Sequence, residues 1–286
     1  MKSSLKSVLN KLGLVKVIHK NLIRLGFSNL QWYPYLDASL DGIIPPRELW
    51  VGSGDPLNHF LRWPYEYRAY LTLLCGMRQD ASVLELGCHH GRTMLALPGY
   101  LQPPGRYEGL DILAKQIEFA QRTIHSRFPI FNFTHADIYN PLYNSTGRVK
   151  AEDYSFPYSD NCFDIIYAAS VFTHLLPPSC SNYFKQSRRV LQKGGQCLFS
   201  FFLLDSYKGP GTSVSPRYEF NLLKEHEGVA VYNPKLPEQV IAYSTSFIER
   251  MASDAGLKVK RTIPGYWSNA HKWNLNEQDL VLLEAV

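Results

Sequence analysis

The stretch LELGCHHGRT (84–93) decides how the rest of the sequence is interpreted. An apolar run carries an acid, two glycines follow four residues apart, and a cysteine and two histidines lie between the glycines. The stretch is either a metal site or a nucleotide-binding turn. Side chains of three consecutive residues cannot all converge on a tetrahedral metal ion, and the usual spacing of zinc ligands is absent. The turn is therefore the favoured interpretation.

Residues 82–86 predict a buried strand, and downstream of them strands alternate with helices. This alternation indicates right-handed crossovers and a parallel sheet covered on both faces. The last two strands have no helix between them, so an antiparallel pair is expected at one edge. Predicted strands cover 82–86, 107–111, 131–135, 163–170, 196–202, 257–263 and 279–285; predicted helices cover about 65–77, 91–101, 113–128, 181–191 and 238–255.

Length and composition favour one large domain with a cap. The chain has 286 residues, 45% of them hydrophobic, and no apolar run approaches the roughly 20 residues that span a bilayer. We expect a helical and aromatic cap over 1–75 and a catalytic domain over 76–286, with a substrate lid inserted at 205–240. Five irregularly spaced cysteines and an N-terminus without a secretory signal predict reduced thiols and a cytoplasmic location.

The net charge of +5 is concentrated near the N-terminus. Residues 1–36 hold six basic residues and no acid, which leaves 24 basic against 25 acidic residues elsewhere. A neutral body argues against a nucleic-acid substrate. Residues 4–26 predict a basic amphipathic helix, which either makes peripheral contact with a membrane surface or packs over the domain or a second subunit.

Glycine spacing in the turn argues for a ligand without phosphates. The pattern is E-x-G-x-x-x-G, which lacks the second glycine of a pyrophosphate-binding turn. Ligands of such sheets lie at the carboxyl ends of the strands. Asp111 ends the second predicted strand, 24 residues after Gly87, where an acid can accept hydrogen bonds from both ribose hydroxyls.

Several segments in sequence order resemble the class I S-adenosylmethionine-dependent methyltransferases. LELGCHHGRT resembles their motif I, with His89 where the middle glycine usually lies. HADIYN (135–140), FPYSDNCFDIIYAASVFTHL (156–175) and RRVLQKGG (188–195) resemble the motifs that follow. The resemblance covers 82–202 and implies an α/β, Rossmann-like, seven-stranded and mostly parallel sheet of order 3-2-1-4-5-7-6. It is closest to the small-molecule subset, the quinone and natural-product type.

The resemblance also implies a cofactor site for S-adenosylmethionine, with S-adenosylhomocysteine as the product. Asp111 would hold the ribose, and Asp137 would accept from the adenine amino group between Ala136 and Ile138. Arg62, Arg68 and Tyr67 are alternative partners for the cofactor's carboxylate. The remaining implied cofactor residues follow the first, second and fourth strands: Glu85, Gly87, Cys88, His89, Gly91, Ile112 and Ser170.

Methyl transfer to an oxygen atom needs a base, and His174 is the candidate. Its usual pKa of about 6.5 suits a base near neutral pH; the alternative is a histidine hydrogen-bonded to the cap or the backbone. Enzymes that methylate base or amide nitrogens typically have an (N/D)-P-P-(Y/F) turn after the fourth strand. This chain has the residues ASVF (169–172) there instead. The Asp-Asn pair of metal-dependent O-methyltransferases is not evident. We therefore expect O-methylation of a small molecule without a metal.

Aromatic residues and histidines of the cap, the lid and the C-terminal segment are the candidate acceptor-binding residues. Two other functions stay open: methylation of a lipid-linked or carrier-bound acceptor at a membrane surface, and cofactor binding without catalysis. The sequence predicts neither the acceptor nor an oligomeric state. The candidates are Tyr33, Tyr35, Trp63, Tyr65, Tyr67, Tyr218, His226, Trp267 and His271.

Overall fold

The computed structural model describes residues 49, 56–207, 218–268 and 275–286. Within these ranges, side chains are described for Leu49 and for the residues from 62 onward. The chain divides into two units, 1–62 and 63–286, and apart from the first residues of helix α3 everything below concerns the second. The predicted helix at 4–26 and most of the predicted cap lie outside the described residues, as do Tyr33, Tyr35 and His271.

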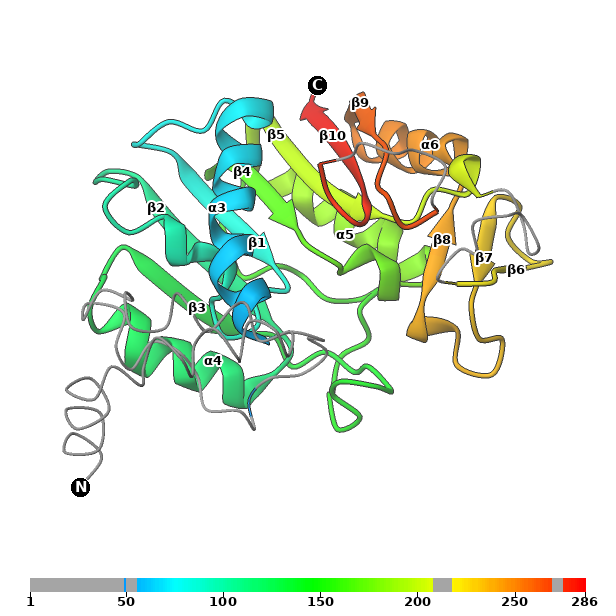
Figure 1. Cartoon of the computed structure of the whole chain (residues 1–286), viewed down its shortest axis with the longest axis horizontal. Helices are drawn as coiled ribbons and strands as arrows, with labels where there is room; N and C mark the ends of the chain where they lie inside the picture. Colours follow the sequence, from blue (N-terminus) through cyan, green and yellow to red (C-terminus); the bar gives the residue numbers. More distant parts are fainter. Residues whose placement is uncertain (1–48, 50–55, 208–217, 269–274) are drawn as a thin grey trace, which may run out of the picture. The chain divides into compact units, whose positions relative to one another are not determined.

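A seven-stranded sheet forms the centre of the second unit (Figure 1). Its order, β3-β2-β1-β4-β5-β10-β9, confirms the predicted 3-2-1-4-5-7-6 arrangement. The first five strands pair in parallel, whereas β10 runs antiparallel to both β5 and β9. The strands are β1 (Ser82–Leu86), β2 (Arg106–Asp111), β3 (Phe131–His135), β4 (Phe163–Ala168), β5 (Leu191–Phe201), β9 (Leu257–Ile263) and β10 (Asp279–Ala285).

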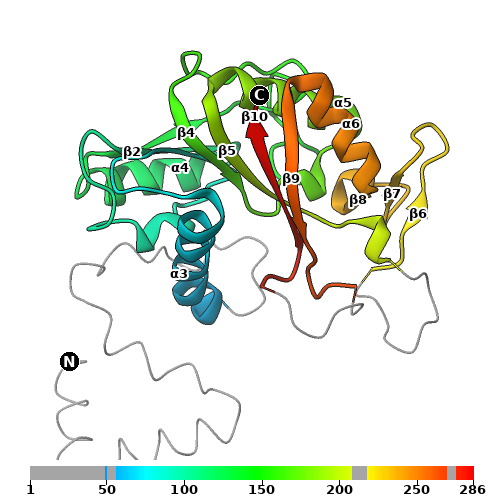
Figure 2. The same ribbon diagram turned by 90° about the horizontal axis from the view of Figure 1, so that it is seen from above.

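Helices cover both faces of this sheet. Figures 1 and 2 show α3 (Pro56–Cys75) on one face and α5 (Pro177–Val190) and α6 (Thr245–Ala255) on the other. The helix α4 (Ala114–Ala120) continues as a π-helical turn over Gln121–His125 between β2 and β3. None of the helices within the described ranges is long and apolar enough to cross a membrane.

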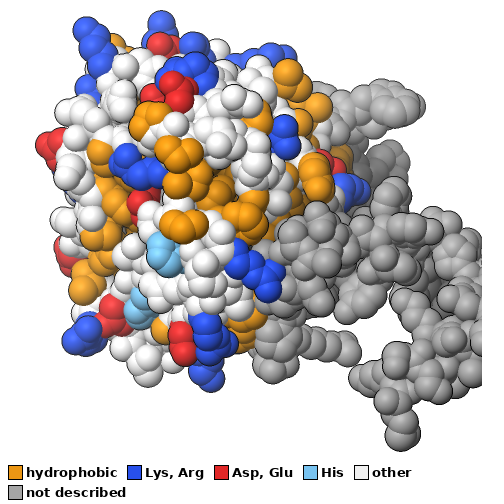
Figure 3. All heavy atoms as spheres, turned by 90° about the vertical axis from the view of Figure 1, so that its left-hand side faces the viewer, with side chains coloured by type: hydrophobic (Ala, Val, Ile, Leu, Met, Phe, Trp, Pro, Cys, Tyr) orange, Lys and Arg blue, Asp and Glu red, His pale blue; other side chains and the backbone are white. Residues whose placement is uncertain are grey.

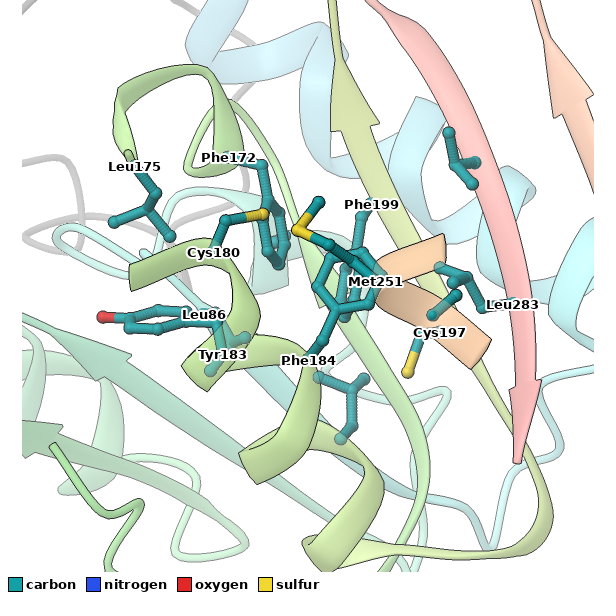
Figure 4. Packing of buried hydrophobic residues seen from close by; sticks show 14 of the residues in the cluster. Leu86, Phe172, Leu175, Cys180, Tyr183, Phe184, Cys197, Phe199, Met251 and Leu283 are labelled. Carbon is teal, nitrogen blue, oxygen red and sulfur yellow. The ribbon is translucent and has the colours of Figure 1, made fainter. Parts of the chain in front are cut away.

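Apolar side chains fill the space between the sheet and the α5–α6 face (Figure 4). Phe172, Phe184 and Phe199 are fully buried, and their ring centroids lie 4.5 to 5.8 Å apart. Close packing of this kind makes any loss of side-chain volume costly. This core fixes β4 and β5 against α5 and so positions the loops at their carboxyl ends.

Several predicted elements differ in the structure: β5 begins five residues and α5 four residues before the predicted start, and three helices differ as follows. The helix predicted over 91–101 is a single 3-10 turn, Thr93–Ala96, because Pro98 and Gly99 follow directly. The helix predicted over 238–255 begins only at Thr245, where the Ser244 side chain accepts from the Phe247 N–H. The helix predicted over 65–77 begins earlier, at Pro56.

The predicted lid is partly a second sheet. β6 (Asn221–Leu222), β7 (Val229–Val231) and β8 (Ile241–Tyr243) form an antiparallel three-stranded sheet. The prediction missed β8 because short apolar runs such as VIAY do not distinguish strand from helix. All of β7 and of β8, which directly follows the predicted lid, is buried, whereas β6 and most of the other described lid residues are exposed or half-buried.

Candidate functional site

The turn after β1 is shaped by two glycines in the left-handed region. Gly87 has φ 74° and Gly91 φ 79°, a conformation that side chains with a Cβ rarely adopt. A Cβ at Gly87 would clash with Val171, and one at Gly91 would lie 2.6 Å from the Ile124 side chain. Glycines at both positions therefore allow the turn to lie close to the loop after β4 and to the helix before β3.

His89 adopts the conformation that a glycine would supply. Its φ is 54°, and its backbone N–H donates to the Asp111 carboxylate at 2.6 Å. The ring Nε2 is buried and has no hydrogen-bond partner among the described residues. Burial and the nearby Arg92 charge lower the pKa of His89 to about 4. His89 is therefore a neutral imidazole with an unused polar atom beside the turn.

Asp111 ties the end of β2 to this turn. Besides the His89 N–H, its carboxylate accepts the Leu113 N–H at 2.9 Å. The side chain is largely buried, and burial raises the pKa of the carboxyl group above its usual value. Asp111 thus lies where the resemblance expects the ribose-binding acid, and it also holds the turn in place.

Glu85 lies beneath the turn in a buried cluster with two tyrosines. Tyr107 on β2 and Tyr167 on β4 both donate their hydroxyls to its Oε2, the second at 2.7 Å. Glu85 is 1% exposed, and burial raises its pKa to about 7 although both hydrogen bonds act in the opposite direction. The acid of the motif supports the turn from below rather than facing solvent.

The segment after β3 provides the positions that the resemblance assigns to adenine. Ala136 and Ile138 are buried, and the Ala136 N–H donates to the Asp111 carbonyl oxygen at 2.8 Å. The Asp137 carboxylate pairs with Arg148, which holds the pKa of Asp137 below its usual value. Asp137 is therefore ionised at neutral pH and lies in line with Asp111 along the carboxyl edge of the sheet.

A hydrogen-bonded network fixes the loop after β4. Ser170 has φ 61°, and its N–H donates to the Ser200 hydroxyl at 2.7 Å. Gln278 joins both serines: its Nε2 donates to Ser170 at 2.9 Å, and its Oε1 accepts from Ser200 at 2.7 Å. Gln278, just before β10, is a site residue that the sequence did not reveal.

His174 lies on the same loop, in the 3-10 turn Phe172–His174. Its Nδ1 lies 2.9 Å from the carbonyl oxygen of Glu238, so Nδ1 carries the proton and the lone pair of a neutral ring is on Nε2. Burial lowers the pKa of His174 below 6.5. Tyr143 packs edge-on against the ring at 5.5 Å between centroids. The contact with Glu238 matches the alternative of a backbone-bonded histidine, and it leaves a neutral imidazole on the loop.

Of the predicted acceptor-binding residues, Tyr218 packs in an aromatic cluster with Phe202, Phe220 and Tyr232. Trp267 is 2% exposed and donates its indole N–H to Asp279 at 2.6 Å, and Tyr67 is also buried. Tyr65 is exposed on α3, Trp63 is half-buried, and His226 lies in the turn between β6 and β7. Tyr143 was missed because its loop contains no motif.

Cys88 and the two histidines after it lie in different surroundings. The Cys88 side chain packs on β2, where a Cβ at Gly109 would come within 2.7 Å of its sulfur. The His89 and His90 rings meet edge to face. In the part of the chain that the structure describes, no three His, Cys, Asp or Glu side chains are grouped closely enough to hold a metal ion.

On the face shown in Figure 3, basic and acidic side chains are interspersed with hydrophobic ones. Over the described residues this face has no broad region of one charge sign.

Comparison with known proteins connects this geometry to a family. Residues 84–199 match the family model described as a methyltransferase domain. The chain is similar in structure to the CcbJ methyltransferase from Streptomyces caelestis (13% identity, 87% of this chain and 98% of that chain, TM-score 0.53). It is also similar to an S-adenosylmethionine-dependent methyltransferase from Mesorhizobium loti (12% identity, 77% of this chain and 97% of that chain, TM-score 0.52). A third similar structure is a protein from Pyrococcus horikoshii (20% identity, 79% of this chain and 93% of that chain, TM-score 0.51). At these identities the likeness shows the fold alone.

The turn fits an adenosine ligand that has no phosphates. The unused Nε2 of His89 and the close approach that Gly87 and Gly91 allow are both at the carboxyl end of β1, where such sheets bind ligands. The matched segment contains the whole turn, Asp111 and Asp137. Residues 84–199 therefore form a methyltransferase domain, and the enzyme uses S-adenosylmethionine and releases S-adenosylhomocysteine.

Proposed function

We propose that the enzyme methylates a small molecule at oxygen and that His174 is the general base. The observation that carries this proposal is the His174–Glu238 hydrogen bond, which leaves Nε2 of a neutral imidazole as a proton acceptor on the loop after β4. Burial lowers the pKa of His174, which favours the neutral form of the ring that can accept a proton. A second support is the Tyr143 ring, which helps hold the imidazole in one orientation.

In the proposed reaction, Nε2 of His174 takes the hydroxyl proton of the acceptor as the acceptor oxygen forms its bond to carbon. S-adenosylmethionine supplies a methyl group on a positively charged sulfur, which leaves as a neutral thioether. Because the leaving group needs no protonation, the protein contributes mainly alignment and exclusion of water. The Ser170–Ser200–Gln278 network supports that alignment by fixing the loop that carries His174.

We further propose that the cofactor lies along the carboxyl edge of β1 to β4. Asp111 would accept from the ribose, and Asp137 would accept from the adenine amino group between Ala136 and Ile138. His89 would contact the methionine end. Glu85, Gly87, Cys88, Gly91, Ile112 and Ser170 would shape or support this site.

The acceptor would bind against Tyr143 and Tyr218, beside His174. Aromatic faces favour an acceptor with an apolar or planar body, since they contribute large contact areas at little cost in side-chain entropy. A reducing, cytoplasmic environment is consistent with the five cysteines, all of which are free thiols and four of which are buried. The alternative of a membrane-presented acceptor depends on residues 4–26, which lie outside the described residues.

The test is methyl transfer to a panel of phenols, hydroxyquinones, carboxylic acids and amines, followed by mass spectrometry. The proposal predicts products only from acceptors with a hydroxyl group. His174→Gln should lower kcat by about 100-fold or more, as expected for loss of a general base, while cofactor affinity measured by calorimetry changes less than about twofold. Methylation of amines alone, or full activity of His174→Gln, would refute O-methylation with this base. Removal of residues 1–26 tests the alternative, which predicts loss of activity only on vesicle-bound acceptors.

A further inference from the structure

A turn beside the second sheet contacts the imidazole of His174. The 3-10 turn Pro237–Gln239 lies between β7 and β8, and the Glu238 carbonyl oxygen is 2.9 Å from Nδ1 of His174, 64 residues away in the sequence. Hydrogen bonding to the backbone of Glu238 and Gln239 raises the pKa of His174, against the larger effect of burial. A carbonyl oxygen can only accept a hydrogen bond, so a ring that keeps this contact has its proton on Nδ1. The position of this carbonyl therefore decides which ring nitrogen is basic.

Asn233 holds the loop that carries this turn with both ends of its side-chain amide. Its Oδ1 accepts the Lys235 N–H and its Nδ2 donates to Oε1 of Gln239, each at 3.0 Å. Within the same loop, the Leu236 N–H donates to the Asn233 carbonyl oxygen at 3.1 Å. A side-chain amide suits this arrangement because it has both an acceptor and a donor. Asn233 thus joins the start of the loop to its end, on either side of the Glu238 carbonyl.

The second sheet also holds the chain directly after His174. Tyr243 of β8 is fully buried and donates its hydroxyl to the carbonyl oxygen of Leu175. At the base of the loop, the Tyr232 N–H donates to the Val240 carbonyl oxygen at 2.9 Å. The loop therefore cannot move away from β7 and β8 without breaking backbone hydrogen bonds. His174 is held through its ring and through the residue that follows it.

We infer that the second sheet sets the tautomer of His174, and that Asn233 is the positioning residue that acts through the Glu238 carbonyl. A neutral imidazole has a proton on one nitrogen and a lone pair on the other, so the bond at Nδ1 leaves Nε2 as the basic atom. When the loop no longer presents the carbonyl, the hydrogen bond that selects this tautomer is lost. The inference rests on the proposed function for its catalytic meaning, whereas the tautomer is a property of the chain itself.

Two other features near His174 do not select a tautomer. The Tyr143 ring packs edge-on, 5.5 Å from the imidazole between centroids, and such packing depends mainly on the shape and orientation of the rings. Both tautomers have the same shape. The network of Ser170, Ser200 and Gln278 fixes the backbone of the loop after β4 at Ser170 rather than at the imidazole. The hydrogen bond from Nδ1 to the Glu238 carbonyl is the contact that distinguishes the two forms.

The experiment determines the tautomer of His174 in the full-length protein by NMR. Long-range proton–nitrogen correlation spectra of protein with isotope-labelled histidine distinguish a protonated from an unprotonated ring nitrogen, and His174→Gln identifies the signals of His174. At pH 8, above the usual histidine pKa of about 6.5, wild type should show a protonated Nδ1 and an unprotonated Nε2. In Asn233→Ala the preference for this tautomer should fall by about 2- to 10-fold, the range that one hydrogen bond supplies.

Two further variants and a second histidine complete the design. Gln239→Ala removes one of the two side-chain contacts of Asn233, so it should shift the tautomer in the same direction but by less. Asn221→Ala is the matched control: Asn221 is exposed in β6 of the same sheet and reaches backbone carbonyls only at 3.4 and 3.5 Å, so the tautomer should not change. Nδ1 of His125 lies 2.9 Å from the Phe131 carbonyl oxygen and should stay protonated in every variant.

Three results would overturn the inference. They are a wild-type His174 with its proton on Nε2 or divided equally between the nitrogens, the wild-type tautomer in both Asn233→Ala and Gln239→Ala, and a shift in Asn221→Ala as large as that in Asn233→Ala. The first result needs no variant and so does not depend on how Asn233→Ala folds. Full activity of His174→Gln would instead refute the general base and would leave the result on the tautomer intact.

Discussion

Glu85 should make the protein less stable as the pH rises, and a glutamine in its place should remove that effect. The pKa of Glu85 is raised from 4.5 to about 7 in the folded state, mainly by burial. The unfolded chain therefore releases this proton near pH 4.5 and the folded chain only near pH 7. Rising pH favours the unfolded state between these values and has no further effect above them. Since each tenfold difference in proton affinity is 1.36 kcal/mol, Glu85 costs the folded state roughly 3 kcal/mol at pH 8.

Urea unfolding of the wild type and of Glu85→Gln at pH values from 4.5 to 8 measures this effect. The free energy of unfolding of Glu85→Gln minus that of the wild type should increase by roughly 3 kcal/mol across the range. Comparison of the two proteins cancels the other titrating groups, including His89. Glu118→Gln, which changes an exposed carboxylate, should shift stability by less than about 0.5 kcal/mol throughout. A difference that stays constant refutes the reasoning, and one that decreases with pH would show that the Arg92 charge outweighs burial.

Two further predictions concern the turn. Gly87→Ala should destabilise the protein by about 2 kcal/mol or more, because the new Cβ clashes with Val171 and alanine is strained in the left-handed conformation. Adding Val171→Ala should recover only the stability lost to the clash. Full recovery of stability in the double variant would contradict the contribution of backbone strain. His89→Gly should be about 1 kcal/mol more stable in urea unfolding than His89→Ala, since both lack the ring and only glycine adopts φ 54° freely. An alanine variant that is equally stable would mean that the turn relaxes.

The strand order could be predicted because it depends on patterns that are local in the sequence. Each of β1 to β4 is a short segment in which apolar residues take buried positions, and the chain between the strands fixes the crossovers. The errors occurred where local patterns are ambiguous. Pro98 stopped the helix after β1 at one turn, and the apolar run that became β8 could equally have begun α6.

The positions along the carboxyl edge could also be predicted, since a parallel sheet brings the ends of its strands together. The residues that hydrogen-bond to these positions could not be predicted. Gln278 reaches Ser170 across 108 residues, and Tyr167 reaches Glu85 across 82 residues. Such contacts depend on strand register and on the direction of side chains, which motifs do not encode.

The turn LELGCHHGRT can dispense with its middle glycine because Asp111 compensates for the loss. A left-handed non-glycine residue is unfavourable by about 1–2 kcal/mol, and the hydrogen bond from the His89 N–H to a carboxylate is of comparable size. The bond exists only because Asp111 ends β2 beside the turn, so the proposed ribose acid and the unusual histidine depend on each other. A ligand that accepted the His89 N–H or competed for the Asp111 oxygens would alter both at once. Cofactor binding and the conformation of the turn are for this reason expected to be coupled.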